Sequence, residues 1–126
     1  MTEIYAILAV IVLFLLSVFQ ILLIAGLPIG KFAWGGAHDV LPNQLRIASI
    51  FSIVLYVVFA LFILNKASVV AYINNSQVVT VGMWVFTAYF LLGVFMNAIS
   101  RSKPERLLMT PVALLLAVLI LHVSLG

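Results

Sequence analysis

The chain has 126 residues, of which 67% are hydrophobic and 7% are charged, with a formal net charge of +3 and no cysteine. An ordinary soluble domain is about 45–50% apolar and about 25% charged, so this composition excludes a soluble globular domain and indicates a protein whose solvent is lipid. The missing cysteines exclude disulfide frameworks, thiolate zinc sites and iron–sulfur clusters, and the scattered cations form no basic face for nucleic acid.

Four apolar segments are long enough to cross a membrane as helices, because a bilayer core about 30 Å thick needs roughly 20 apolar helical residues. They cover residues 4–26, 46–65, 78–100 and 104–125. The runs are continuous, unlike the short alternating strands of a β-barrel, and the first is preceded by Glu3 rather than by the Lys or Arg of a signal peptide. The sequence predicts an all-α, single-domain membrane protein over residues 1–126, with four transmembrane helices in an antiparallel bundle of two hairpins.

The loops carry basic residues unequally, and this inequality predicts an orientation. Loops 27–45 and 101–103 and the span ends beside them hold Lys31, Arg46, Arg101, Lys103 and Arg106, whereas the other side has only Lys66. The positive-inside rule therefore places these two loops in the cytoplasm and both termini outside. The same inequality argues against insertion in both orientations.

Segment 27–45 mixes aromatic residues, the pair Gly35-Gly36 and the neighbours His38 and Asp39. One interpretation is a re-entrant or lid-like loop over a pocket, with Trp34 and His38 as ligand contacts. In the other, which we favour, Trp34 belongs to the interfacial aromatic belt, the glycines make a turn, and Asp39 caps the next helix.

The start of the fourth helix is marked by Ser102 and Glu105, which have the spacing of a capping box, with Pro104 in the first turn. Glu105 is thus assigned to a helix boundary. Pro111 lies about two turns further on, where its ring should bend the helix unless Thr110 or a neighbour satisfies the freed carbonyl.

Polar side chains within the spans gather in their cytoplasmic halves. If each faces the bundle interior, they surround a polar pocket that opens toward the cytoplasm, and the candidate lining residues are Ser17, Gln20, Ser49, Ser52, Asn97 and Thr110. Gln20 and Asn97 should match in depth and lie within reach of one another. The alternative is that these groups only join neighbouring helices, as Ser, Thr, Asn and Gln commonly do in membranes.

The mouth of this pocket would be formed by the loop ends, with candidate residues Trp34, His38, Asp39, Arg46, Arg101 and Arg106. The three arginines would draw an anionic group toward it.

No catalytic constellation is evident. His38 and His122 lie near opposite ends of the bundle and cannot share a metal or haem, and no serine has a base placed to activate it. The carboxylates all lie at span boundaries, which argues against proton-coupled exchange through a buried acid. We therefore expect neither an enzyme nor a metal or other cofactor.

Two blocks, GLPIGKFAWGGAHDVLPNQLRIAS and MNAISRSKPERLLMTPVAL, resemble a group of small bacterial four-span membrane proteins of uncharacterised function. The resemblance implies a bacterial inner-membrane protein and transfers no activity or catalytic residue.

Two functions remain open. The first is a protein that binds or passes a small or lipid-like molecule, with an anionic one favoured by the arginines. The second is an accessory or structural subunit that packs against a larger membrane complex. The expected partners are the lipid bilayer, the small molecule or lipid, and further copies of the chain or a larger complex, with no nucleic acid.

Overall fold

The computed structural model describes residues 2–126 and contains four long helices: α1 (Thr2–Ile24), α2 (Asn43–Lys66), α3 (Ser76–Ala98) and α4 (Lys103–Leu125). Each is long and apolar enough to cross a membrane. Two short 3-10 turns, η1 (Gly30–Phe32) and η2 (Trp34–Gly36), lie in the α1–α2 loop, residues 25–42. The described chain is all-helical, which confirms the predicted four-helix membrane bundle.

Side-chain caps define two of the helix starts. Asn75 Oδ1 accepts hydrogen bonds from the backbone N–H groups of Gln77 and Val78 at the start of α3. Ser102 Oγ accepts one from the Glu105 N–H at 3.4 Å, so the predicted start of α4 is confirmed. The predicted cap of α2 is wrong: the N-cap residue is Pro42, with no side-chain cap, and Val40 and Leu41 separate Asp39 from it.

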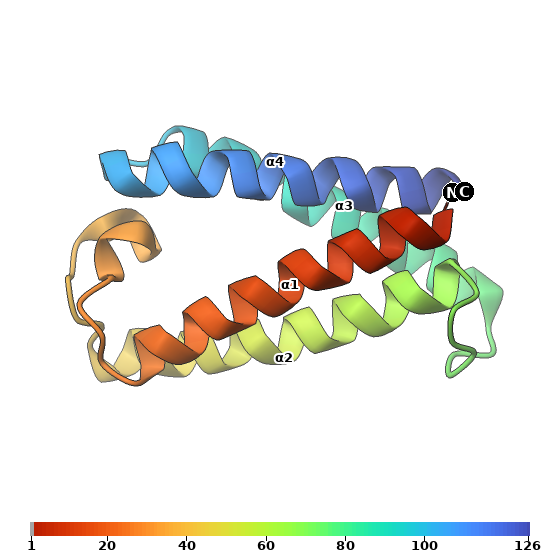
Figure 1. The fold of residues 1–126 in the computed structure, drawn as a ribbon, viewed down its shortest axis with the longest axis horizontal. Coiled ribbons are helices and arrows are strands. Elements are labelled where there is room, and N and C mark those ends of the chain that lie inside the picture. The colour runs from red at the N-terminus through yellow and green to blue at the C-terminus, as the bar shows by residue number, and fades with distance from the viewer. Residues whose placement is uncertain (1) are drawn as a thin grey trace.

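The helices form two antiparallel hairpins, α1 with α2 and α3 with α4, and both chain termini lie at one end of the bundle (Figure 1). At that end the hairpins pack closely through small and branched side chains. This closed end is built on Ala6, Ala9, Leu13, Met83, Ile120 and Val123, all at most 2% exposed. Small residues let helix backbones approach each other closely, which drives helix association in lipid.

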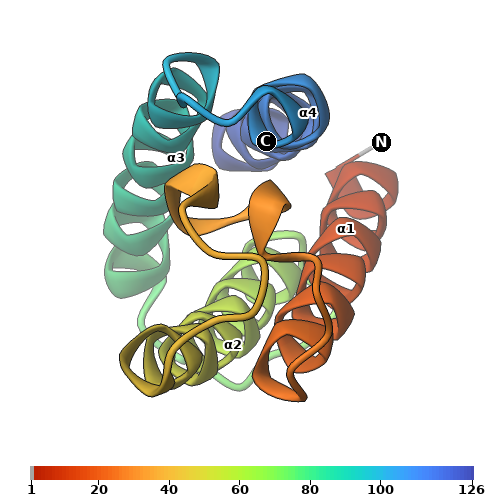
Figure 2. The ribbon, with the colours of Figure 1, turned by 90° about the vertical axis from the view of Figure 1, so that its left-hand side faces the viewer.

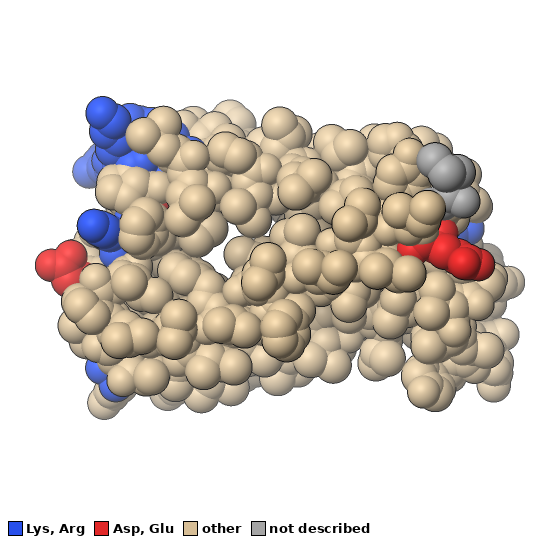
Figure 3. All heavy atoms as spheres, viewed as in Figure 1, with Lys and Arg blue, Asp and Glu red and all other residues tan. Residues whose placement is uncertain are grey.

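The other end of the bundle is arranged differently. Here the α1–α2 loop folds inward, and its two 3-10 turns lie between the ends of the hairpins (Figure 2). Its own small core consists of Leu23, Ala33 and Leu41. Lys and Arg side chains gather around this open end (Figure 3). The bundle is therefore closed by apolar packing at one end and by an inserted loop at the other.

Candidate functional site

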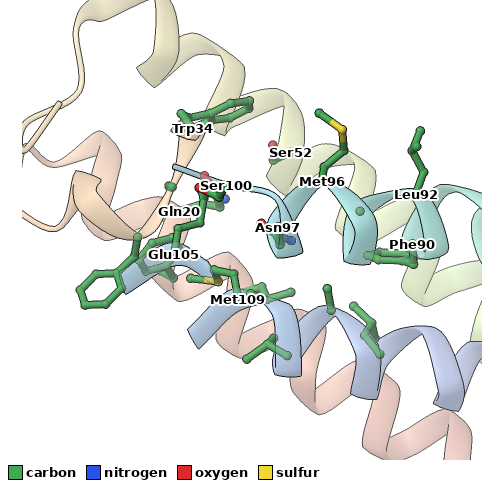
Figure 4. Close-up of a pocket in the computed structure, with 18 of the residues that line it drawn as sticks. Gln20, Trp34, Ser52, Phe90, Leu92, Met96, Asn97, Ser100, Glu105 and Met109 are labelled. Carbon is green, nitrogen blue, oxygen red and sulfur yellow. The ribbon is translucent and has the colours of Figure 1, made fainter. Parts of the chain in front are cut away.

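A cavity of ≈ 640 Å³ lies between the two hairpins at the open end, with walls from all four long helices and from the α1–α2 loop (Figure 4). Most of its wall is apolar, from Leu16, Phe19, Phe90, Met96, Met109, Val112 and Leu116 among others. Its polar side chains are those of Gln20, Trp34, Ser52, Tyr56, Tyr89, Asn97, Ser100 and Glu105. Ligand pockets in proteins are typically about 300–1,000 Å³ and mostly apolar with a few polar groups, and this cavity has that character.

The α1–α2 loop forms the roof of the cavity through residues 32–35. The Trp34 indole N–H donates to Ser49 Oγ on α2 at 3.2 Å, and the Gly35 N–H donates to Glu105 Oε2 on α4 at 3.2 Å. The Ser102 hydroxyl donates to the Lys31 carbonyl. The loop is thus fastened to both hairpins. This geometry matches the lid-like interpretation for Trp34 and differs from the favoured one, which placed Trp34 in the aromatic belt.

Backbone conformation explains why glycines are needed in this roof. Gly36 has φ +72, in the left-handed region that favours glycine, and a Cβ there would collide with the Ser102 side chain. Gly35 has φ +78, yet a Cβ there would meet no atom within 4 Å. Both positions therefore need the left-handed backbone that glycine adopts, but only Gly36 also lacks room for a side chain.

Glu105 is the functional candidate that sequence reasoning missed. It occupies the last position of the capping box, three residues after Ser102, but its carboxylate turns to the Gly35 N–H of the roof, and the side chain is only 6% exposed. The N–H of Ser102 bonds Ser100 Oγ instead. A signal was available in the sequence: Glu105 shares a helical face with Met109, Val112 and Leu116, which all line the cavity.

Gln20 on α1 is 7% exposed and lines the cavity, and its Oε1 has no hydrogen-bond partner. Ser52 on α2 and Asn97 on α3 line the same cavity. Gln20, Asn97, Ser100 and Glu105 all lie toward the loop end in Figure 4. A buried acceptor without a partner costs free energy, so the Gln20 oxygen marks a place where a donor from a ligand or water fits.

The other three candidates for the lining lie outside the wall. Ser17 Oγ donates to the Leu13 carbonyl on its own helix, and Ser49 lies behind Trp34. Thr110 Oγ1 is buried without a partner, so it does not satisfy the carbonyl freed by Pro111, and α4 nevertheless runs as one helix through that proline.

Of the candidate residues for the mouth of the pocket, some line the cavity and others do not. Trp34 lines the cavity, whereas His38 and Asp39 are exposed and lie outside the wall. Arg46 Nε donates to the Leu41 carbonyl at 2.9 Å, Arg106 Nη1 donates to the Ser100 carbonyl at 3.2 Å, and Arg101 is exposed. Among residues 2–126, Glu105 is therefore the one charged side chain in the cavity wall. The basic residues form a rim around the open end rather than part of the cavity.

The cavity opens sideways as well as beneath the loop. In Figure 3 an opening passes through the molecule between α1 and α4, beside the α1–α2 loop. On α3, Leu92 and Met96 line the cavity and are also 60% and 56% exposed. In a membrane these side chains face lipid, so the cavity communicates with the hydrocarbon region.

Within residues 2–126 no three His, Asp or Glu side chains come together as metal ligands. Comparison of the chain with protein-family models, with curated proteins and with solved structures gives no match, so any function must be inferred from the geometry of the site.

Proposed function

We propose that this small membrane protein binds a lipid-like amphipathic molecule in the cavity beneath the α1–α2 loop. The observation that carries the proposal is the distribution of polarity along the cavity. The side chains of Gln20, Asn97, Ser100 and Glu105 lie toward the loop, whereas the deeper wall is mainly apolar, with Leu16, Phe90 and Leu116 beside the phenol rings of Tyr56 and Tyr89. An amphiphile in a bilayer has the same arrangement, with its head at the interface and its tail in hydrocarbon.

The side opening supports this proposal because it gives an apolar tail a route from the bilayer. The two helices beside this opening contribute apolar side chains to the cavity wall, Leu16 and Phe19 from α1 and Met109 and Val112 from α4. A tail that entered there would exchange contacts with lipid for contacts with these side chains at little cost in desolvation. The role proposed is binding rather than catalysis.

Gly93→Leu tests the proposal directly. Gly93 lies on α3 in the cavity wall, and a Cβ added there would meet no atom within 4 Å. A leucine at this position would fill part of the cavity without a clash. We expect it to abolish retention of lipid-like molecules, measured by native mass spectrometry after mild detergent extraction, while thermal stability is unchanged or higher.

The matched control is Gly93→Ala, which adds one methyl group and leaves most of the cavity empty. It should retain the bound molecule at the level of the parent protein. If the parent protein carries no bound molecule, or if Gly93→Leu retains it equally, the binding proposal fails. The accessory-subunit function then becomes the better one, and cross-linking to a larger membrane complex is its test.

For the cellular setting we propose the bacterial inner membrane, with residues 27–45 and 101–103 in the cytoplasm and both termini outside. The support is the grouping of Lys31, Arg46, Arg101, Lys103 and Arg106 at one end of the bundle. Single cysteines at Ala37 and Asn75 test it in intact cells with an impermeant thiol reagent. Only the cysteine at Asn75 should react, and reaction at Ala37 alone would reverse the orientation.

A further inference from the structure

We propose that the site selects amphiphiles whose head group is a protonated amine, which Glu105 and Gln20 would bind together. This inference rests on the proposed function and names the class of its ligand. It differs from the expectation drawn from the arginines, because those side chains bind backbone carbonyls or lie exposed outside the cavity wall.

The first argument is the sign of the charge. The carboxylate of Glu105 is buried in the cavity wall, and no cationic side chain within residues 2–126 shares that wall. A phosphate or carboxylate head group placed here would meet a like charge in a low-dielectric setting. An ammonium group would instead form a charge-assisted hydrogen bond to the carboxylate.

The second argument is the number of acceptors. An ammonium has three N–H donors and no acceptor, whereas an ionised carboxylate has about four lone-pair positions. The only hydrogen bond that the described residues make to the Glu105 carboxylate comes from Gly35, and the buried Gln20 Oε1 has none. Gln20 and Glu105, which both line the cavity, therefore offer an amine head group acceptors that the protein leaves unused.

The structural role of Glu105 does not explain why the buried Gln20 oxygen has no hydrogen-bond partner. A glutamate in the first turn of α4 is stabilised by the helix dipole, and its bond to Gly35 fastens the roof. Neither contact provides a donor for the Gln20 oxygen, which is on a different helix and faces the same cavity. The Gln20 side chain lies beside the Tyr56 hydroxyl of α2, and a ligand N–H would supply the donor that its oxygen lacks.

The basic rim determines the route of entry. Five Lys or Arg residues surround the open end and would oppose the approach of a cation from water. Exposed charges are screened beyond about 8 Å at physiological ionic strength. A cationic amphiphile already partitioned into the bilayer avoids the rim by entering between α1 and α4. Trp34 in the cavity wall provides an aromatic ring that also favours a cation, whereas the Phe32 ring already has Lys31 Nζ at 5.3 Å from its centroid.

The test uses Trp34 as a reporter within the roof. The chain has two tryptophans, and Trp84→Phe leaves Trp34 alone. The protein in phosphatidylcholine vesicles is titrated with dodecylamine, dodecanol and dodecyl phosphate, which share one tail and differ in head group. We expect a saturable change in Trp34 emission with dodecylamine, at a midpoint at least tenfold lower than with the other two.

Two variants with the same change in charge locate the effect. Glu105→Gln keeps an acceptor for the Gly35 N–H and removes the negative charge, so it should raise the dodecylamine midpoint at least tenfold. Glu3→Gln removes a negative charge from an exposed residue near the opposite end of the bundle and should leave the midpoint unchanged. Equal midpoints for Glu105→Gln and Glu3→Gln would overturn the assignment of Glu105.

Gln20→Leu provides a second variant that leaves the roof contacts intact. It should weaken the binding of dodecylamine, which donates N–H bonds, and have little effect on dodecyltrimethylammonium, which has no N–H to donate. Equal losses for the two probes would overturn the role of the Gln20 oxygen.

The outcomes separate this inference from the proposed function. Saturable binding of all three probes with equal midpoints would leave a lipid-binding site and overturn the amine preference. No saturable change with any probe would overturn both. Vesicles that contain phosphatidylethanolamine distinguish the source of the amine: competition with dodecylamine assigns a bilayer lipid, and its absence assigns a free amphiphilic amine.

Discussion

The closed and open ends of this bundle use the same four helices to different effect. At the closed end, side chains such as Ala9, Met83 and Ile120 are fully buried against one another. At the open end, the hairpins separate around a cavity, and a loop held by a few polar contacts takes the place of direct helix packing. The comparison indicates that the closed end holds the hairpins together, whereas the open end keeps a cavity between them.

This division has a physical basis in the side chains that the two ends present. In lipid, helices associate by close packing and polar contacts because the surrounding tails are as apolar as the helices themselves. Ala6, Ala9 and Ala117 allow that close packing near the termini. Near the loop, the facing residues are larger or polar, such as Phe19, Gln20 and Met109, and they line a cavity instead.

The two ends should differ most in the free energy of unfolding that is lost when one apolar side chain at each end is replaced by alanine. Ile120→Ala removes a side chain that is 0% exposed, and such changes cost about 2–5 kcal/mol in well-packed cores. Leu92→Ala, in the cavity wall and 60% exposed, should cost less than about 1 kcal/mol because few contacts are lost. Unfolding in detergent micelles with dodecyl sulfate measures both free energies. Equal losses would show that the open end is packed as firmly as the closed end.

The roof of the open end should be most sensitive at Gly36. An alanine at Gly35 or Gly36 must adopt a left-handed conformation, which costs roughly 1–2 kcal/mol. Only at Gly36 does the added methyl group also collide with Ser102, and overpacking of this kind adds about 1–3 kcal/mol. Hydrogen exchange of the loop amides should therefore accelerate more in Gly36→Ala than in the matched Gly35→Ala. The same rate in both would mean that the roof does not depend on its contact with α4.

The sequence predicts the helices better than it predicts the site. Continuous apolar runs and the spacing of Ser102 and Glu105 suffice to locate four helices, because span length and capping are local properties. The path of the α1–α2 loop is not local. It depends on contacts from Trp34 to Ser49 and from Gly35 to Glu105, which are 15 and 70 residues apart in the chain.

The same limit explains why the sequence does not show which charged side chain lies in the cavity wall. The arginines are close to the predicted mouth in sequence, but Arg46 and Arg106 fold back onto backbone carbonyls. Glu105 has an ordinary place in a capping box, and only the inward fold of the loop encloses it. Positions along a helix are readable from periodicity, whereas the enclosure of a side chain by a distant loop is not.

A smaller effect is expected from the hydrogen bond between the roof and α2. Ser49→Ala removes the acceptor of the Trp34 indole N–H, and loss of one such bond costs about 1 kcal/mol. With Trp84→Phe in the background, Trp34 emission should shift to longer wavelength as the indole becomes more mobile and hydrated. Ser52→Ala is the matched control, because the Ser52 hydroxyl bonds the Ala48 carbonyl of its own helix. An equal shift in both variants would mean that Ser49 does not hold the indole.

The smallest effect should come from the polar contact at the closed end, between the Thr87 and Ser124 hydroxyls at 3.2 Å. Each hydroxyl also bonds a carbonyl of its own helix, at 2.8 Å for Thr87 and 2.9 Å for Ser124, so neither is left without a partner when the other is removed. A double-mutant cycle with Thr87→Val and Ser124→Ala should therefore give a coupling energy of about 0.6 kcal/mol, the average for such pairs in membranes. A coupling above about 2 kcal/mol would exceed the range known for these bonds. It would mean that this polar contact, rather than apolar packing such as that of Met83 and Ile120, holds α3 against α4 within their hairpin.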